Sequence, residues 1–340
     1  MTRSETRVRV LVADDSEIFR EVLSRVIGAD PGFEVVAVAA DGNDAARLTR
    51  ELRPDVITMD LNMPDADGFS GIARIMAETP TPIMVLTANK AEVVGFKALS
   101  LGALDILEKP EASADLEAYG AEIRSRLRLL SGVKVIRHLR GLRERRLPLP
   151  ARPGRRADVV VIGASLGGPR ALATLLRGLP ADFPVGIAVV QHIADGFTEG
   201  LASWLAQECP LRVRQAVDGD LLQPGQVLLA PSGHHLLVGE GRVRLFDGPP
   251  VDTFKPSVTP LFLSAAQAYG ARACGVILTG MGHDGAAGLK ALHDAGGLTL
   301  AQDEQSSAVF GMPKAAIDLG AVDRVLPLDD LPRTLVALTQ

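Results

Sequence analysis

Cysteine and aromatic residues are scarce in this chain of 340 residues, which contains two cysteines, one tryptophan and two tyrosines. Two cysteines, Cys209 and Cys274, are too few for the disulfide framework typical of small secreted domains, and they lie far apart in the sequence. Each lies in an apolar context. We therefore expect both to be buried free thiols in a reducing compartment.

The chain also lacks an apolar run long enough to cross a membrane, and its N-terminus lacks the apolar core of a secretory signal. We therefore expect a cytoplasmic protein without membrane insertion. An excess of basic residues is missing too: the net charge is −5, so composition gives no argument for nucleic-acid binding. The 47% of hydrophobic and 23% of charged residues are ordinary for a globular protein, and the length suffices for two domains.

The first part of the chain, residues 1–130, alternates short aliphatic runs with amphipathic segments. The pattern predicts strands at 8–12, 35–38, 56–59, 83–86 and 104–107, and helices near 16–27, 43–52, 69–77, 91–101 and after 112. Such βα repetition favours an α/β fold with a doubly wound parallel sheet. In such a sheet the functional site lies beyond the carboxyl ends of the strands.

Polar residues follow the predicted strands of this first domain. Asp14 and Asp15 close the first strand, Asp60 the third, Thr87 the fourth and Lys109 the fifth. Three carboxylates at one edge would repel one another unless a cation lies among them, and oxygen ligands of this kind suit Mg²⁺. A lysine and a hydroxyl at the same edge suit a phosphoryl group. Taken singly, each acid could also be a solvated loop residue or a helix cap.

Residues 8–130 resemble a two-component receiver domain. The stretch from Asp60 to Gly68, DLNMPDADG, matches the receiver motif D-x-x-M-P-x-x-D-G. The resemblance implies that Asp60 accepts a phosphoryl group. It further implies a Mg²⁺ site formed by Asp14, Asp15, Asp60 and the backbone carbonyl of Asn62, with Thr87 and Lys109 contacting the phosphoryl oxygens.

A basic segment, which we expect to be a linker over 131–156, separates the two halves. Residues 134–156 carry nine arginines or lysines and one acid, Glu144, and include Pro148, Pro150 and Pro153. A charged, proline-punctuated composition of this kind is typical of a solvated connector. It is also compatible with a docking surface for an acidic partner or for the other domain.

The second half, residues 157–340, is organised around the segment ADVVVIGASLGGP, which begins at Ala157. The aliphatic run Val159 to Ile162 predicts a buried strand, and leucines spaced by three and four predict a helix after Pro169. Ser165 therefore lies in a tight strand-to-helix turn whose sequence fits the G-x-S-x-G nucleophile elbow. The alternative is that Ser165 only caps the helix.

Two further polar residues follow aliphatic strands in this half. His192 comes after a predicted strand at 185–190, and Asp284 follows another at 275–278. Because such strand ends meet at one edge of a doubly wound sheet, Ser165, His192 and Asp284 would form a nucleophile, a base and an orienting acid. Three other histidines compete as bases: His234, His235 and His283.

The loop that carries Asp284 also spells G-x-G-x-x-G over residues 280–285, and Asp303 follows the next strand. That spacing approaches the dinucleotide-binding fingerprint. Against it, Asp284 would place a negative charge where a pyrophosphate requires N–H donors. Both interpretations of the loop remain open at this point.

Residues 157–328 resemble the catalytic domain of the chemotaxis protein-glutamate methylesterases, the CheB family. The matching stretches are VVVIGASLGGP, VVQHI, PGQVLLAPSGHHLLV, FKPSVTPLFLSAA, GVILTGMGHDGAAGL and AQDEQSSAVFGMPKAAI. The resemblance implies that Ser165, His192 and Asp284 are the triad and that the backbone N–H of Met281 helps form the oxyanion hole. Leu166 stands where some members carry a threonine, so only its backbone N–H would contribute.

The resemblance also implies a function for the whole chain. We expect a phosphorylation-controlled serine hydrolase that removes methyl groups from γ-glutamyl methyl esters of methyl-accepting chemoreceptors. Deamidation of receptor glutamines at the same site is a further option. The phosphodonor would be a chemotaxis histidine kinase, the catalytic domain would need no cofactor, and the chain would be a monomer whose unphosphorylated receiver covers the active site. A competing class is a non-enzymatic response regulator whose second domain only binds a partner.

Overall fold

The computed structural model describes residues 7–63, 68–88, 93–110, 115–133 and 156–339. By internal contacts the chain divides into two compact units, Met1–Arg143 and Glu144–Gln340. Most of the linker expected at 131–156 falls outside the described residues, so its proposed boundaries stay a prediction. The two units are described separately below.

The first unit is a five-stranded sheet in the order β2-β1-β3-β4-β5, and every neighbouring pair is parallel. Its strands are β1 (Val8–Ala13), β2 (Phe33–Ala39), β3 (Val56–Asp60), β4 (Ile83–Thr87) and β5 (Asp105–Glu108). Its helices are α1 (Glu17–Gly28), α2 (Gly42–Leu52), α3 (Gly68–Glu78), α4 (Val93–Leu101) and α5 (Leu116–Ser131). The order reverses direction between β1 and β3, which makes their carboxyl ends the switch point of the sheet.

Local sequence explains where the helices of this unit begin. Ser16 caps α1 by accepting a hydrogen bond from the Phe19 N–H, and Asp41 and Asp115 cap α2 and α5 in the same way. The central strands β3 and β4 are buried along their whole length. Continuous aliphatic strands of this kind are typical of a parallel sheet covered on both faces.

The second unit is a seven-stranded parallel sheet in the order β14-β13-β12-β6-β7-β9-β8, with a separate antiparallel hairpin of β10 and β11. Its strands are β6 (Val159–Ala164), β7 (Gly186–Gln191), β8 (Arg212–Gln215), β9 (Gln226–Leu229), β10 (His235–Gly239), β11 (Arg242–Phe246), β12 (Ala273–Ile277), β13 (Leu298–Gln302) and β14 (Arg324–Leu326). Its α-helices are α6 (Gly168–Arg177), α7 (Thr198–Glu208), α8 (Val258–Ala268), α9 (Ala286–Asp294), α10 (Met312–Asp318) and α11 (Leu331–Thr339).

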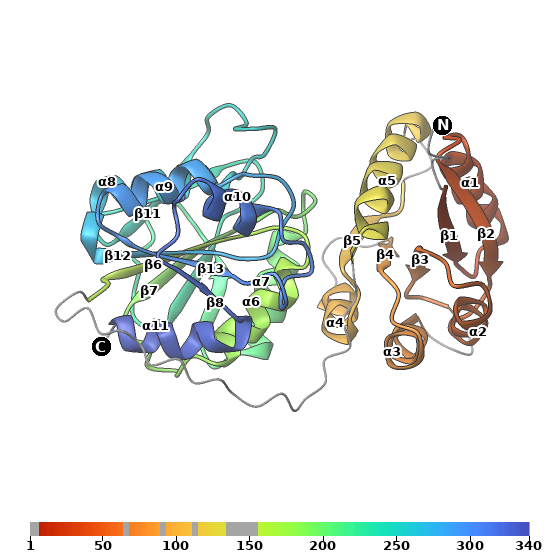
Figure 1. Cartoon of the computed structure of the whole chain (residues 1–340), viewed down its shortest axis with the longest axis horizontal. Coiled ribbons are helices and arrows are strands. Elements are labelled where there is room, and N and C mark those ends of the chain that lie inside the picture. Colours follow the sequence, from red (N-terminus) through yellow and green to blue (C-terminus); the bar gives the residue numbers. More distant parts are fainter. Residues whose placement is uncertain (1–6, 64–67, 89–92, 111–114, 134–155, 340) are drawn as a thin grey trace. The chain divides into compact units, whose positions relative to one another are not determined.

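Helices cover both faces of this second sheet: α8, α9 and α10 lie on one side, and α6, α7 and α11 on the other (Figure 1). The strands β6 and β7 are completely buried. Strands β7, β9 and β8 lie on one side of β6, and strands β12, β13 and β14, which come later in the chain, lie on its other side. The switch point therefore lies between β6 and β12, and loops that follow β6, β7 and β12 emerge around it.

The predicted α/β architecture is confirmed for both units, with element ends that differ by a few residues. Three elements, α10, β14 and α11, were not predicted from the sequence. The expectation of two buried thiols holds for Cys274, whose pKa burial raises to about 12, whereas Cys209 is only half-buried. Within the described residues, no helix is both long enough and apolar enough to span a membrane.

Candidate active site and phosphorylation site

Ser165 lies directly after β6, at the switch point of the second sheet. Its N–H donates to the carbonyl of Thr279 at 3.0 Å, and its own carbonyl accepts the Gly168 N–H at 2.8 Å. The residue that caps α6 is Gly167, which has a φ of 75° and makes no side-chain capping bond. The interpretation of Ser165 as a helix cap is therefore wrong, and its side chain is not committed to the helix.

A glycine opposite Ser165 makes room for this turn. A Cβ at Gly280 would lie 2.7 Å from the Ser165 Cβ and 2.3 Å from the Met312 sulfur, so only glycine fits there. Leu166 follows Ser165 in the chain, and Met281 follows Gly280. The backbone N–H groups of Leu166 and Met281 donate no hydrogen bond within the described residues. Free N–H groups beside a nucleophile are what a developing oxyanion requires.

His192 and Asp284 are brought together in the loops after β7 and β12. The His192 Nε2 lies 2.8 Å from Asp284 Oδ2, and both side chains are buried. The N–H of His192 donates to the carbonyl of Ala164 at 2.9 Å, which ties the histidine to the end of β6. The sequence-based expectation that these loops converge is borne out by this geometry.

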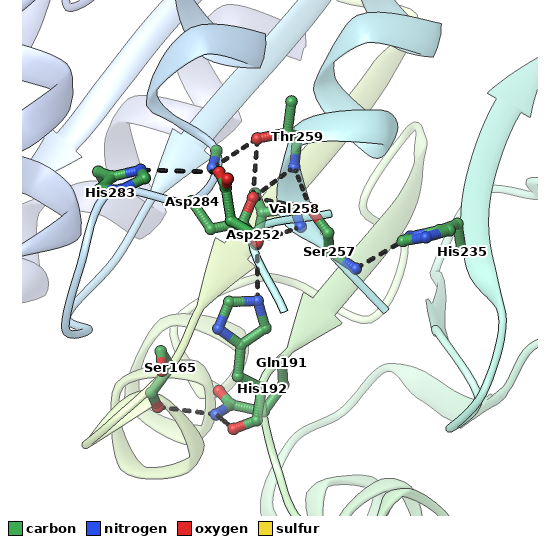
Figure 2. Close-up of polar contacts among 11 residues, drawn as sticks. Ser165, Gln191, His192, His235, Asp252, Ser257, Val258, Thr259, His283 and Asp284 are labelled. Atoms are coloured by element: carbon green, nitrogen blue, oxygen red, sulfur yellow. Dashed lines mark hydrogen bonds and ion pairs between the residues drawn. The ribbon is translucent and has the colours of Figure 1, made fainter. Parts of the chain in front are cut away.

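Asp284 receives hydrogen bonds from the first turn of α8 as well as from His192 (Figure 2). Its Oδ1 accepts from Ser257 Oγ at 2.7 Å, Thr259 Oγ1 at 2.7 Å and Thr259 N at 3.1 Å. Its Oδ2 accepts from Val258 N at 2.7 Å. Burial alone would raise the pKa of Asp284, but the hydrogen bonds that it accepts from His192, Ser257 and Thr259 hold it well below its ordinary value.

The carboxylate therefore decides which nitrogen of His192 is free. An ionised Asp284 can only accept, so His192 Nε2 must carry the proton of their hydrogen bond. The other nitrogen, Nδ1, is buried and has no hydrogen-bond partner, and Figure 2 shows Ser165 on that side of the ring. No hydrogen bond joins the Ser165 hydroxyl to His192 within the described residues. In the neutral imidazole with its proton on Nε2, Nδ1 is the nitrogen able to accept a proton from a nucleophile.

Two residues that were not predicted from the sequence, Gln191 and Phe254, support this histidine. The Gln191 side-chain amide donates to the carbonyls of Ser165 at 2.7 Å and His192 at 2.8 Å, and so joins the two loops. The Phe254 ring stacks on the imidazole of His192 with centroids 3.9 Å apart and planes 3° from parallel. A polar residue at the end of an aliphatic strand could have pointed to Gln191, but no local pattern points to Phe254.

The competing histidines lie elsewhere. His283 is 72% exposed and faces Asp252, with 3.7 Å between Nδ1 and Oδ2. His235 is buried, and its ring nitrogens contact Ser257 N and Pro249 O instead of Asp284. The alternative of a dinucleotide loop at 280–285 is also disfavoured. The buried carboxylate of Asp284 lies two residues before the start of α9, where it would repel a pyrophosphate, and it is paired with His192.

In the first unit, Lys109 lies between two buried carboxylates. Its Nζ is 2.7 Å from Asp14 Oδ2 and 2.9 Å from Asp60 Oδ2, and it lies 4.8 Å from the centroid of the Phe19 ring. Burial opposes the charge of Lys109, but its bonds to Asp14 and Asp60 outweigh burial and raise its pKa. For Asp14, burial is the largest effect and raises its pKa in spite of the lysine.

The other predicted receiver residues lie around this pair. Asp14, Asp15 and Asp60 offer carboxylate oxygens within 4.8 Å of one another, Asp15 being exposed, and this oxygen-only set fits Mg²⁺. The exposed Asn62 donates its N–H to Asp60 Oδ1 at 3.3 Å, and the buried Thr87 accepts the Lys109 N–H on its carbonyl at 2.7 Å.

The motif glycine, Gly68, is required by the backbone of the candidate acceptor. A Cβ there would lie 2.1 Å from the carbonyl oxygen of Asp60. The motif residues from Pro64 to Asp67 lie outside the described residues. The close approach of Gly68 to the Asp60 carbonyl explains why the motif ends in glycine, and Asp60, its first residue, is the last residue of β3.

The fold and these two constellations define a two-domain protein in which a receiver-like unit precedes a serine-hydrolase-like unit. Family models agree: a response regulator receiver domain matches residues 10–119, and CheB methylesterase matches residues 160–335. The chain therefore belongs to the CheB methylesterase family and is a hydrolase that carries a receiver domain.

Individual relatives cover nearly the whole chain. Protein-glutamate methylesterase/protein-glutamine glutaminase 2 of Anaeromyxobacter dehalogenans (strain 2CP-C) is 73% identical over 333 residues, which are 98% of this chain and 97% of that protein. Protein-glutamate methylesterase/protein-glutamine glutaminase 4 of Myxococcus xanthus (strain DK1622) is 45% identical, over 97% of this chain and 96% of its own. The crystal structure of the Thermotoga maritima CheB methylesterase catalytic domain matches with a TM-score of 0.52 and 40% identity, covering 54% of this chain and 98% of that one.

Proposed function

We propose that this protein hydrolyses γ-glutamyl methyl esters on methyl-accepting chemoreceptors, with Ser165, His192 and Asp284 as its catalytic residues. The observation that carries the proposal is the pairing of His192 Nε2 with an ionised Asp284, which leaves Nδ1 without a partner on the side of Ser165. The names of the relatives, which combine a methylesterase with a glutaminase, support the substrate class.

The chemistry follows from these positions. Ser165 Oγ attacks the ester carbonyl while His192 Nδ1 takes its proton, and Asp284 stabilises the imidazolium that forms. The N–H groups of Leu166 and Met281 donate to the carbonyl oxygen as it becomes negative. His192 then gives the proton to the methoxide, which leaves as methanol. Water, deprotonated by His192, attacks the acyl-enzyme, and the glutamate carboxylate departs as Ser165 recovers its proton.

The same residues can deamidate a glutamine. The amide carbonyl is attacked in the same way, and His192 protonates the departing nitrogen, so that ammonia replaces methanol as the product. The acyl-enzyme is identical in both reactions. The glutaminase part of the relatives' names supports this second activity.

Control would come from the receiver unit. Asp60 accepts a phosphoryl group from a chemotaxis histidine kinase, and Thr87 and Lys109 contact the phosphoryl oxygens. Asp14, Asp15, Asp60 and the backbone carbonyl of Asn62 would hold Mg²⁺, which offsets the charge of the acids and of the phosphoryl group when bound. The catalytic unit requires no cofactor in this scheme. Lys109, already paired with Asp60, adds the positive charge that the protein itself supplies.

The arrangement of the whole chain is part of the proposal. Residues 1–130 form the receiver domain, 131–156 the linker and 157–340 the catalytic domain of a cytoplasmic monomer. In the unphosphorylated state the receiver limits access to Ser165, and phosphorylation releases it.

A serine-directed probe separates this proposal from a non-enzymatic response regulator. A fluorophosphonate should label the full-length protein at Ser165, and Ser165→Ala should abolish both labelling and release of methanol from methylated receptors. Because the substitution is small and lies on a loop, the melting temperature should hardly change. Methanol release by the Ser165→Ala variant at a rate comparable to the wild type would show that another residue is the nucleophile.

A further inference from the structure

His235, the first residue of β10, is a buried histidine outside the proposed triad, and its two ring nitrogens each have a partner. Its Nδ1 lies 3.2 Å from the backbone nitrogen of Ser257, and its Nε2 lies 3.0 Å from the carbonyl oxygen of Pro249. Only 1% of the residue is exposed, so water cannot substitute for either partner.

The two partners define its protonation state. The Ser257 N–H is a donor, so Nδ1 must carry no hydrogen and act as the acceptor. The Pro249 carbonyl is an acceptor, so Nε2 must carry a hydrogen. His235 is therefore the neutral Nε2–H tautomer. A proton on Nδ1 would point an N–H at another N–H inside the protein.

The bond from Nδ1 leads to the candidate acid. Ser257 is the N-cap of α8, and its hydroxyl donates to Asp284 Oδ1 at 2.7 Å (Figure 2). The next two residues of α8 donate to the same carboxylate. The first turn of α8 thus orients Asp284. The side chain of His235 accepts a hydrogen bond from the backbone N–H of Ser257 and so helps to fix the start of that turn.

The bond from Nε2 leads to the aromatic ring that stacks on His192. Pro249 belongs to the connection between β11 and α8, residues 247–257, which also carries Phe254. This connection is closed by mutual backbone bonds between Val251 and Phe254 and by an ion pair of 2.5 Å between Lys255 and Asp247. The hydrogen bond from His235 to Pro249 therefore helps to fix the segment that places Phe254 against the imidazole of His192.

We propose that His235, as the neutral Nε2–H tautomer, is a positioning residue for the candidate active site: it aligns Asp284 through Ser257 and Phe254 through Pro249. It touches neither Ser165 nor His192 in any described contact, so it acts through these intermediaries. The kinetic part of the proposal rests on the hydrolase function proposed above; the structural part does not.

Two substitutions separate the two bonds. In His235→Asn the amide oxygen can take the place of Nδ1 and accept from Ser257, whereas in His235→Gln the amide nitrogen can take the place of Nε2 and donate to Pro249. His234→Gln at the neighbouring, half-buried position is the matched control. Each variant is made in the full-length chain and its melting temperature is measured, so that only folded protein is compared.

The kinetic readout is the split between kcat and KM for demethylation of methylated receptor. We expect His235→Gln to lower kcat by about tenfold or more with KM within about twofold, because alignment of the base matters most in the transition state. His235→Asn should lower kcat less, by about threefold, because the link to Asp284 is kept and only the bond to Pro249, which positions Phe254, is lost. A His235→Gln variant that is folded and as fast as His234→Gln, or one that changes KM alone, would overturn the proposal.

The structural readout is the NMR signal of the His192 Nε2 proton in its bond to Asp284. It should be shifted or lost in His235→Gln and kept in His235→Asn and His234→Gln. These NMR changes in a protein without esterase activity would uphold the positioning role and refute the proposed function. Unchanged signals in folded His235→Gln would refute the positioning role, whatever the activity.

Discussion

His192 presents its Nε2, not its Nδ1, to Asp284 at 2.8 Å. In the Ser–His–Asp arrangement of the serine proteases the acid binds Nδ1 and the base is Nε2. Here the imidazole is turned the other way, so Nδ1 is the nitrogen left for Ser165. The stack of Phe254 on the ring keeps the imidazole in this orientation, and four further donors hold the Asp284 carboxylate that binds it.

Asp284→Asn tests the acid. The variant loses the charge that stabilises an imidazolium and can orient the wrong tautomer, so kcat should fall by about three to four orders of magnitude. Its NH₂ group would also meet donors from the first turn of α8, which should cost about 1–3 kcal/mol of unfolding free energy. Steady-state kinetics and denaturant unfolding measure the two effects.

The pH dependence of that stability difference has a definite sign. Because folding lowers the pKa of Asp284 from its ordinary 3.8, the ionised group adds stability that is fully present above pH 3.8. This stability disappears as pH falls through the lowered pKa. The gap between wild type and Asp284→Asn should be constant from about pH 5 to 8 and narrow only in stronger acid. A gap that already closes between about pH 6 and 5 contradicts a lowered pKa.

Gly163→Ala tests the packing behind the acid. A Cβ there would lie 2.2 Å from Val258 Cγ1, and the Val258 N–H binds Asp284. We expect a loss of about 1–3 kcal/mol from overpacking and a fall in kcat as α8 shifts. Gly239→Ala is the control, since this strand glycine has its nearest neighbour, the Ala268 Cβ, at an ordinary 3.7 Å. Equal behaviour of the two variants would show that Val258 moves without cost.

Phosphorylation should require both Asp60 and a divalent cation. A small phosphodonor should modify the wild type with Mg²⁺ and leave Asp60→Ala unmodified, because a phosphoryl group adds about two negative charges beside Asp14 and Asp15. Mass spectrometry of the intact protein measures the reaction. Modification that persists in EDTA, or in Asp60→Ala, would place the acceptor elsewhere.

Removal of the receiver tests how the two units communicate. A fragment that begins near Arg156 should demethylate receptors faster than the unphosphorylated full-length protein, and a tenfold gain needs a shift of only about 1.4 kcal/mol between closed and open states. Asp60→Ala should keep the low basal rate and no longer respond to phosphodonor. A fragment no faster than the intact chain means that the receiver acts by direct stimulation instead of occlusion.

Much of this protein was predictable from the sequence because its signals are local. Aliphatic runs marked the strands, and Ser165, His192, Asp14, Asp60 and Lys109 each stand within two residues of a strand end. Parallel strands direct their carboxyl ends to one edge, so proximity in space followed from position along the chain. The sequence also showed glycines at 163, 168 and 280, but it did not indicate which side chains pack closely against each of them.

The tertiary structure decided the contacts that join distant segments. His235 reaches the site from the β10–β11 hairpin, Phe254 from the connection that follows it, and Ser257 from the start of α8. No periodicity relates these residues to Asp284 or His192. Which imidazole nitrogen is free depends on where the carboxylate lies around the ring, and that is a property of packing between loops. The sequence determined which chemical groups the candidate site contains. The packing of α8 and its preceding loop against the sheet determined how those groups are oriented and which of them donate hydrogen bonds. The reason is that the direction of a hydrogen bond depends on where its two partners lie in three dimensions.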